Sequence, residues 1–465
     1  MSLLSAKILA ARAVGGLARR AGRGGGTSLP GKVLIRLEPE AIGELSARLP
    51  RGSLVISATN GKTTTAAMTA AVLERSGIAL VHNRAGANMA GGVASTLLAA
   101  ARPGRTIDGE LGLFEVDEFW LDRLIPQLEP RAVLLANLFR DQLDRYGELE
   151  TIADRWAAVV ARMSSSSRLV LNADDPLIAD LGRRMPNVTY FGVEDGSVAV
   201  PEMQHASDSK HCRRCGAAYA YDAVYLGHLG RYHCPSCGQT RPRPSISAEA
   251  IRFDGTRGAA FRLCTREATA DVALPLPGLY NVYNALAAAA LCLQLQIPLE
   301  TVAAGLEAVA AAFGRAETVA IGGVELSILL VKNPAGANEI LRTLVLEPGE
   351  LDLLAILNDR TADGRDVSWI WDADFELLAP HVRRATCAGT RAAELALRLK
   401  YAGVPVERLE VIPPLAPAFD AAVGRTASER LFALPTYTAL LELHEELAAR
   451  GHVPQFWERT GAAPR

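Results

Sequence analysis

Short apolar runs alternate along the first half of the chain with longer segments in which apolar residues recur every three or four positions. The short runs have the length and composition of buried strands, and they lie at residues 53–58, 113–116, 132–136 and 169–171. The longer segments, 64–76 and 152–162, have a helical pattern, and Gly77 follows the first of them as a stop signal. This alternation predicts a mostly parallel sheet covered by helices.

The alternation stops near Pro201 and resumes after residue 247. The intervening residues are polar and end close to a proline-rich string at 240–244, which is typical of an inserted subdomain. A second series of apolar runs follows at 327–331, 351–357 and 408–411. We therefore expect four parts: an N-terminal helix and lead-in at 1–40, a central α/β domain at 41–315, its insertion at 202–247, and a C-terminal α/β domain at 316–465.

The composition is that of an ordinary globular protein. A length of 465 residues predicts two to four domains, and 49% apolar with 22% charged residues excludes disorder and coiled coil for most of the chain. Lys and Arg, 49 in all, nearly balance 51 Asp and Glu, which leaves a net charge of −2. This balance argues against a dedicated nucleic-acid binder, whose affinity comes from neutralising phosphates.

Two segments have a superficial likeness to membrane or targeting segments. Residues 272–299 carry no charge, but prolines, asparagines and glutamines interrupt them, so we expect a buried helix. The first 30 residues are rich in Ala, Leu and basic residues but lack an apolar core after the charges, which predicts an N-terminal helix instead of a leader.

The seven cysteines divide into two groups. Four of them form two Cys-x-x-Cys pairs separated by the 18 residues 216–233, a spacing that predicts a structural zinc ribbon held by Cys212, Cys215, Cys234 and Cys237. The alternative is four unrelated thiols. The other three, Cys264, Cys292 and Cys387, stand singly in apolar surroundings and are expected to be buried. Free thiols and a metal site together indicate a reducing, cytoplasmic location.

A Gly-Lys-Thr sequence lies between the strand at 53–58 and the helix at 64–76. In such a loop, backbone N–H groups hold phosphates, Lys62 reaches the β and γ oxygens, and the Thr63 hydroxyl binds Mg²⁺. The match to the full phosphate-loop motif is incomplete because Ile56 stands where its first glycine would be. An incidental surface turn is the weaker alternative.

Two polar stretches follow later strands of the same sheet. Residues 115–118, Glu-Val-Asp-Glu, place carboxylates at a strand's carboxyl end, where Mg²⁺ beside phosphates finds oxygen ligands. An acidic helix start is the alternative explanation. Residues 137–147 are the second stretch.

These motifs occur in the order seen in the Mur ligase family, which the chain resembles over essentially its whole length. Five segments carry the resemblance: 59–65, the glutamate of 115–118, 137–147, 278–285 and 314–317. The four-cysteine insertion, residues 358–372 and residues 435–438 are most similar to the members that amidate the D-glutamate of the lipid II stem peptide. The resemblance implies a Mur-type phosphate-loop domain and a Rossmann-like C-terminal domain.

The resemblance also implies a reaction and roles for residues. In Mur ligases a carboxylate attacks the γ-phosphate of ATP, and an amine displaces the resulting acyl phosphate. The nucleotide-binding residues carried over are Thr59, Asn60, Gly61, Lys62, Thr63, Thr64, Asn281, Asn284 and Arg315. Thr63 and Glu115 are implied as magnesium ligands, and Asn88 as a contact for a phosphate of the substrate. Lys62 and Glu115 are thereby expected to be catalytic.

Two positions depart from the family pattern. Gln142 replaces a metal-binding histidine, and residues 329–334, Leu-Leu-Val-Lys-Asn-Pro, lack the aspartate that binds ribose. Lys332 is a candidate for contacting the nucleotide instead. Both losses are in keeping with ammonia as the nucleophile in place of an amino acid.

Ammonia at neutral pH is scarce, so such a synthetase needs a glutaminase. Residues 385–389, around Cys387, and His444 resemble glutaminase motifs, but too few residues follow to form that domain. The resemblance therefore implies a partner, a GatD-type glutaminase, and lipid II as a substrate met at the inner face of the membrane. Asp366, and after it Asp363, is expected to complete the partner's Cys-His pair; a helix cap or a nucleotide contact is the alternative for each.

Other functions remain open at this point. A ligase that adds an amino acid, such as a folylpolyglutamate synthase, would need no glutaminase. A zinc-ribbon ATPase acting on nucleic acid would need a basic face, and the departures at Gln142 and Leu329 are compatible with a non-catalytic nucleotide-binding scaffold.

Overall fold

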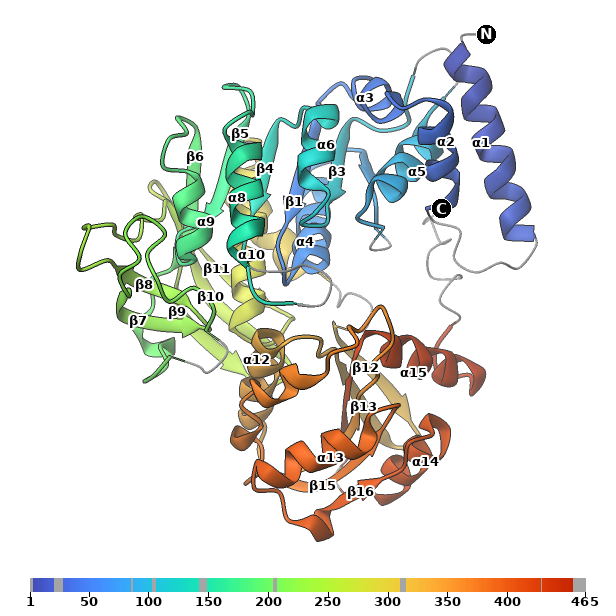
Figure 1. Cartoon of the computed structure of the whole chain (residues 1–465), viewed down its shortest axis with the longest axis vertical. Helices are drawn as coiled ribbons and strands as arrows, with labels where there is room; N and C mark the ends of the chain where they lie inside the picture. The colour runs from blue at the N-terminus through green and yellow to red at the C-terminus, as the bar shows by residue number, and fades with distance from the viewer. Residues whose placement is uncertain are drawn as a thin grey trace.

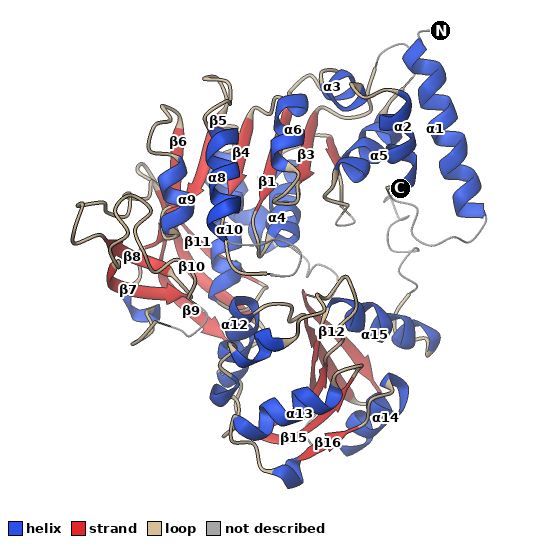
Figure 2. Cartoon of the chain, viewed as in Figure 1, coloured by secondary structure: helices blue, strands red, loops and turns tan. Residues whose placement is uncertain are grey.

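Two β-sheets, each covered by helices on both faces, organise the chain into two bodies (Figures 1 and 2). The structure is a computed structural model and describes residues 3–20, 28–84, 87–102, 106–141, 149–203, 207–309, 315–427 and 429–454. The N-terminal helices cover one end of the larger body in Figure 1, and α12 (Pro334–Val345) of the smaller body lies against it.

The larger body contains a nine-stranded sheet in the order β11-β10-β9-β6-β5-β4-β1-β3-β2. Its strands are β1 (Ser53–Ser57), β2 (Leu80–His82), β3 (Leu111–Glu115), β4 (Ala132–Leu135), β5 (Arg168–Asn172), β6 (Val188–Val193), β9 (Ile246–Asp254), β10 (Gly258–Cys264) and β11 (Thr269–Leu274). Its helices are α1 (Leu3–Arg20), α2 (Leu29–Leu37), α3 (Ala41–Ser46), α4 (Lys62–Arg75), α5 (Ala90–Ala100), α6 (Leu121–Leu128), α8 (Leu149–Val160), α9 (Pro176–Leu181), α10 (Leu279–Leu293) and α11 (Leu299–Glu307), with the 3₁₀ turn η2 (Gly196–Val198).

Strand β1 lies inside this sheet, parallel to β3 on one side and β4 on the other. Alternate residues point to opposite faces, so Leu54 and Ile56 pack with α4 and α10, whereas Val55 packs with α2 and α5. Parallel pairing continues from β2 to β9, and only β9, β10 and β11 are antiparallel to one another. The prediction of a mostly parallel sheet is confirmed, with strand bounds within two residues.

The inserted segment leaves the sheet between β6 and β9, which pair directly with each other. It contains the two-stranded hairpin of β7 (Ala220–Leu226) and β8 (Leu229–His233). Because β9 begins at Ile246, the expected limit at residue 247 lies two residues inside the sheet.

The smaller body has a six-stranded sheet in the order β12-β13-β17-β14-β15-β16, in which only β12 is antiparallel to its neighbour. The strands are β12 (Arg315–Ile321), β13 (Val324–Leu329), β14 (Leu351–Ile356), β15 (Val382–Ala388), β16 (Leu409–Val411) and β17 (Arg430–Pro435). With α12, the helices are α13 (Ala392–Tyr401), α14 (Leu415–Arg425) and α15 (Tyr437–Ala449), and the 3₁₀ turns are η3 (Ser368–Trp371), η4 (Phe375–Leu377) and η5 (Val406–Arg408).

The single cysteines are not all buried as expected. Cys292 in α10 and Cys387 in β15 are fully buried, and burial raises the pKa of Cys387 to about 12, so neither is a nucleophile. Cys264 is partly exposed because β10 ends there, beside the turn to β11. Helix α10 is buried as predicted, and among the described residues no helix has the length and apolarity to cross a membrane.

A close helix contact fixes the N-terminal end of the larger body. Gly31 of α2 packs so tightly on α5 that a Cβ there would lie 2.0 Å from the Gly91 carbonyl oxygen. The Gly31 N–H also donates to Ser95 Oγ at 2.8 Å. Helix α5 follows the loop that contains Asn88, so this contact positions a predicted substrate residue.

Replacing Gly31 by Ala should force the two helices apart. We expect Gly31→Ala to lower the free energy of unfolding by about 1–3 kcal/mol, seen as a lower midpoint in thermal unfolding. Gly16→Ala is the control, because a Cβ at Gly16 meets no atom within 4 Å. It should leave the midpoint unchanged or raise it, and an equal loss in both variants would contradict the packing argument.

Candidate functional site

The loop between β1 and α4 forms the floor of the site. Gly61 has a φ of 84°, and a Cβ there would lie 2.0 Å from Asn284 Oδ1 of α10. Only glycine fits this backbone and this approach. Asn284 also accepts a hydrogen bond from Thr65 Oγ1 at 3.2 Å and donates to Asn281 Oδ1 at 3.1 Å. Helix α10 thus holds the start of α4.

The end of β4 holds the other side of this loop. Asn137 Oδ1 accepts from the Asn60 N–H at 2.9 Å, and its Nδ2 donates to the Asn60 carbonyl at 3.0 Å. Thr59 Oγ1 accepts from the Phe139 N–H at 3.1 Å. The loop is therefore fixed by residues that follow the neighbouring strand, as expected where parallel strands end together.

Lys62 is buried, with 8% of its surface exposed, and its ammonium group is enclosed by oxygen atoms. Its Nζ lies 2.9 Å from Glu118 Oε2 and donates to the carbonyls of Ala58 and Thr59. Burial alone would lower the pKa of Lys62, but the nearby carboxylates, Glu118 first among them, outweigh burial and raise it. The site therefore holds a fixed positive charge at neutral pH.

Thr63 and Glu115 lie together beside this charge. Thr63 Oγ1 donates to Glu115 Oε1 at 3.1 Å, and Asn83 hydrogen-bonds both the N–H and the carbonyl of Glu115, at 2.9 and 2.8 Å. A hydroxyl and a carboxylate at this spacing are hard oxygen ligands of the kind Mg²⁺ prefers, so these residues fit the metal predicted here. Asn88 lies near the same strand end, where its carbonyl accepts from the Asp117 N–H at 2.9 Å.

A cleft opens above the loop, between the two bodies. Its lining comprises Asn60, Gly61, Thr64, Asn137, Phe139, Leu226, Leu229, Tyr280, Tyr283, Asn284, Leu329, Leu330, Lys332, Ala335, Gly336, Glu339 and Ile340. Asn284 is part of this lining, whereas Asn281 lies behind it and donates to the Pro277 carbonyl at 2.7 Å.

The smaller body contributes Lys332 to the cleft, and the neighbouring Asn333 contacts the larger body. Lys332 Nζ lies 2.8 Å from Asp141 Oδ2, and Asn333 Nδ2 donates to Asp141 Oδ1 at 3.2 Å and to Asn60 Oδ1 at 2.9 Å. The cleft lining includes Lys332, as its candidate role requires. The sequence does not reveal that Asn333 contacts Asn60 and Asp141, or that Glu118 pairs with Lys62. The Asn-Pro pair at 333–334 is nevertheless a recognisable helix start.

Two predicted site residues lie wholly or partly outside the part of the chain that the structure describes. Gln142 is outside the described residues, and so is the side chain of Arg315. The backbone of Arg315 pairs with Leu329, which lines the cleft.

The two candidate aspartates differ in their surroundings. Asp363 is 5% exposed and accepts from the Thr438 N–H at 2.7 Å and from Thr438 Oγ1 at 2.5 Å, so it caps the start of α15. Asp366 is exposed and accepts from the Ser368 N–H at 2.8 Å, and the hydrogen bonds from Ser368 lower its pKa. Only Asp366 presents a charged carboxylate to the surface.

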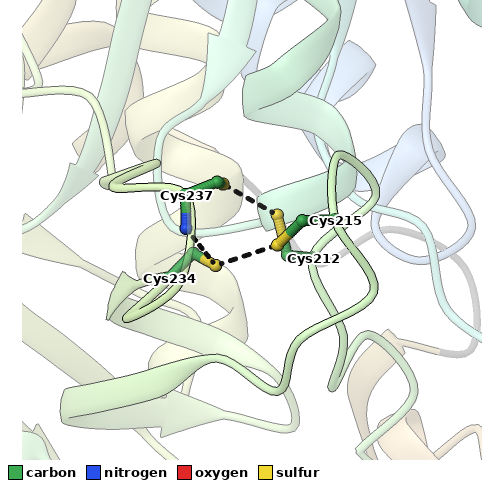
Figure 3. A group of neighbouring side chains, drawn as sticks. All are labelled: Cys212, Cys215, Cys234 and Cys237. Carbon is green, nitrogen blue, oxygen red and sulfur yellow. Dashed lines mark hydrogen bonds between the residues drawn. The ribbon is translucent and has the colours of Figure 1, made fainter.

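The four cysteines of the insertion converge from two loops (Figure 3). All four sulfur atoms lie within 4.8 Å of one another; Cys212 and Cys237 are 3.6 Å apart, and Cys215 and Cys234 are 3.5 Å apart. A Zn–S distance of about 2.3 Å places the sulfurs of a regular tetrahedron about 3.8 Å apart, whereas a disulfide needs about 2.05 Å. The geometry fits a tetrahedral zinc ion.

The two cysteine pairs have the same local backbone. Gly216 and Gly238 directly follow the second cysteine of each pair, with φ of 77° and 72°. Their N–H groups donate to the carbonyls of Cys212 and Cys234, at 2.8 and 3.1 Å. Two matching turns that aim four thiols at one point are typical of a built metal site.

Comparisons with known proteins agree with this geometry. The Mur ligase middle domain matches residues 56–233, and the MurT ligase C-terminal domain matches residues 330–440. The lipid II isoglutaminyl synthase subunit MurT of Streptococcus pneumoniae is 32% identical, with 95% of this chain and 96% of the relative covered. The protein of the same name from Staphylococcus aureus strain N315 is 33% identical, with 93% and 95% covered.

Solved structures give the same fold at lower identity. A pseudomurein peptide ligase type C from Methanothermus fervidus has a TM-score of 0.66 at 22% identity, with 87% of this chain and 80% of that one covered. MurF from Acinetobacter baumannii has a TM-score of 0.64 at 18% identity, with 90% and 80% covered. These likenesses confirm the Mur-ligase-like α/β fold.

The cysteine geometry leads to a metal prediction. We expect purified protein to contain about one zinc per chain, and Cys237→Ser to lose it with a lower midpoint of thermal unfolding. Cys264→Ser is the matched control, because Cys264 lies outside the cluster. Elemental analysis of the three proteins measures the zinc, and equal content in wild type and Cys237→Ser would contradict the site.

Proposed function

The chain belongs to the MurT family of the Mur ligases, and we propose that it is the synthetase subunit of a lipid II isoglutaminyl synthase. It would use ATP to convert the α-carboxylate of D-glutamate in the lipid II stem peptide into an acyl phosphate, which ammonia displaces to give D-isoglutamine during peptidoglycan synthesis. The observation that carries this proposal is the identity of 32–33% with curated MurT subunits along 93–95% of the chain.

The cleft supports the first half of this reaction. A carboxylate and ammonia at neutral pH do not condense, so a carboxylate oxygen must first be phosphorylated; it then leaves as phosphate when ammonia attacks the acyl carbon. We assign the β and γ phosphates of ATP to Lys62 and to the N–H groups at the start of α4, where the helix dipole favours negative charge. Thr63 and Glu115 would hold Mg²⁺, which supplies charge neutralisation between the phosphates. Asn88 is our candidate for orienting the substrate.

The remaining assignments follow the same proposal. We place the nucleotide against Thr59, Asn60, Thr64 and Asn284, with Arg315 toward the γ-phosphate. Residues 41–315 form the proposed ATP-binding domain with its zinc-ribbon insertion, and residues 316–465 form the C-terminal domain. A lipid-linked substrate would bring the protein to the inner face of the membrane as a peripheral enzyme.

The source of ammonia is proposed to be a glutaminase subunit of the GatD type. An exposed carboxylate on the C-terminal domain could orient the histidine of a partner's Cys-His pair, as the third member of a triad does. Asp366 is exposed and charged, whereas both carboxylate oxygens of Asp363 are already engaged by Thr438. We therefore assign this role to Asp366.

Loss of the buried charge should stop the chemistry. Lys62→Ala is expected to reduce ATP-dependent amidation of lipid II by about 10²–10³-fold, because it removes the buried ammonium group assigned to the β and γ phosphates. The assay supplies ATP, Mg²⁺ and ammonium chloride and detects by mass spectrometry the decrease of about one mass unit when NH₂ replaces OH. Lys400→Ala, at an exposed position of α13, is the control for a lost lysine. Full amidation by a folded Lys62→Ala protein would refute the mechanism.

A comparison of glutamine with ammonium as the nitrogen source distinguishes the roles proposed for Asp366 and Asp363. With the glutaminase partner present, Asp366→Asn should lose glutamine-dependent amidation and keep ammonium-dependent amidation. Asp363→Asn should lower the thermal midpoint and reduce both activities alike, since it weakens the cap of α15. Equal loss of both activities in a stable Asp366→Asn protein would exclude Asp366 from the partner's site.

A further inference from the structure

The cysteine-containing insertion contributes two apolar residues, Leu226 and Leu229, to the lining of the cleft. Leu226 is the last residue of β7 and Leu229 the first of β8, so both lie at the tip of the hairpin. They are 5% and 1% exposed, line the cleft, and belong to the same apolar cluster as Phe139 and Tyr283. The function proposed above gives these residues no role.

The hairpin tip contacts the segment that fixes the phosphate loop. The His228 ring lies 4.8 Å from that of Phe139, and its Nε2 is 3.4 Å from Asp175 Oδ2, with both side chains fully buried. Asp175 accepts from the Leu138 N–H at 2.9 Å, and the Phe139 N–H donates to Thr59. A displacement of the tip would therefore disturb Phe139 and, through it, one side of the loop.

The four cysteines lie at the opposite end of the hairpin. Strand β8 ends at His233, directly before Cys234, and the bridge between His211 and Ala218 lies next to Cys212. The rings of Tyr219 and Tyr232 meet edge to face, with centroids 5.1 Å apart, and form one small apolar cluster with Cys212 and Cys234. The pairing of β7 with β8 extends from Ala220–His233 at this end to Leu226–Leu229 at the tip, with register shifts between Tyr221 and Ala223 and between Val224 and Leu226.

The smaller body also contacts the tip. Arg342 of α12 donates from Nη1 to the Tyr225 carbonyl at 2.9 Å. Residues of α12, Gly336 and Ile340 among them, line the cleft opposite the hairpin. The tip is thus enclosed between the phosphate-loop side and the second body.

The lining of the cleft includes both polar and apolar residues. Asn60, Gly61 and Thr64 lie at the phosphate loop, and Phe139, Leu226 and Leu229 supply apolar surface at the hairpin tip. The flat apolar faces of a purine gain from such a surface, and the charged phosphates do not.

We propose that the tip of the β7–β8 hairpin forms the wall against the adenine base, and that the four-cysteine cluster positions this wall. Zinc binding and nucleotide binding are then coupled, and the insertion is a part of the ATP site. This inference rests on the proposed ATP-dependent function and on the proposed zinc.

The first test compares two ligands that differ only in the presence of the nucleoside. Calorimetry measures the affinity of each protein for Mg-ATP and for magnesium tripolyphosphate. Leu226→Ala and Leu229→Ala should bind ATP about tenfold more weakly, because each removes apolar contact with the base, while tripolyphosphate binding stays unchanged. Val224→Ala is the matched control, because Val224 is buried in the same strand but does not line the cleft.

The second test addresses the cysteines. Chelation of zinc, and Cys237→Ser, should weaken ATP binding by about tenfold or more, and returned zinc should restore it in the wild type only. Hydrogen exchange should show faster exchange in β7 and β8 after chelation. If chelation unfolds the whole chain, the role of the tip is decided by the ATP affinity of Leu226→Ala and Leu229→Ala, in which zinc is retained.

The outcomes are distinguishable. Unchanged ATP affinity in both leucine variants would overturn the base wall, and equal loss for ATP and tripolyphosphate would show a merely structural role. Unchanged ATP affinity in a folded, zinc-free protein would overturn the coupling. Failure of the wild type to bind ATP would instead refute the proposed function.

Discussion

The ammonium group of Lys62 lies almost out of contact with water, and the surrounding structure compensates this buried charge. Desolvation of an ion costs several kcal/mol unless opposite charge and hydrogen bonds replace the lost water. Glu118 and two main-chain carbonyls supply this replacement. Gly61, between these carbonyls and Lys62 in the chain, takes a positive φ against Asn284. The carboxylates that balance Lys62 would repel phosphates, and the Mg²⁺ proposed at Thr63 and Glu115 would offset this repulsion.

The contacts between the two bodies at the cleft are polar. Asn60, Asp141, Lys332 and Asn333 meet through hydrogen bonds and one ion pair, which exchange with water at a small net gain. An interface of this kind gives less stability than the apolar clusters within each body. These contacts position Lys332, which adds a second positive charge to the cleft only when the two bodies meet. The second body thereby takes part in the charge balance set by Lys62.

Local patterns could be read from the sequence, and long-range contacts could not. Strand β1 and helix α4 were predictable because apolar periodicity and the Gly-Lys-Thr turn are properties of adjacent residues. The four-cysteine cluster was equally predictable, since its spacing is itself the signal. The roles of Asp363 and Asp366 could not be told apart from the sequence, because the contact that makes Asp363 the cap of α15 is with Thr438, 75 residues away from it. Leu226 and Leu229 gave no signal, since apolar residues at a hairpin tip are also typical of an ordinary core, and the exposure of Cys264 depends on where β10 ends.

The size of the insertion explains why its stability would depend on cysteines. Among the described residues around them lies a small apolar cluster, in which Cys212 and Cys234 themselves take part with Tyr219, Tyr232 and Ala179 of α9. So small a core gives little stability of its own, and small segments of this kind are commonly held by a metal. The two buried leucines lie at the other end of the hairpin, where they join the main core of the larger body. The hairpin is therefore held at both ends, by the cysteine cluster at one and by the main core at the other. Under the proposal above, loss of structure at the cysteine end would let the two leucines at the tip shift relative to a bound ligand.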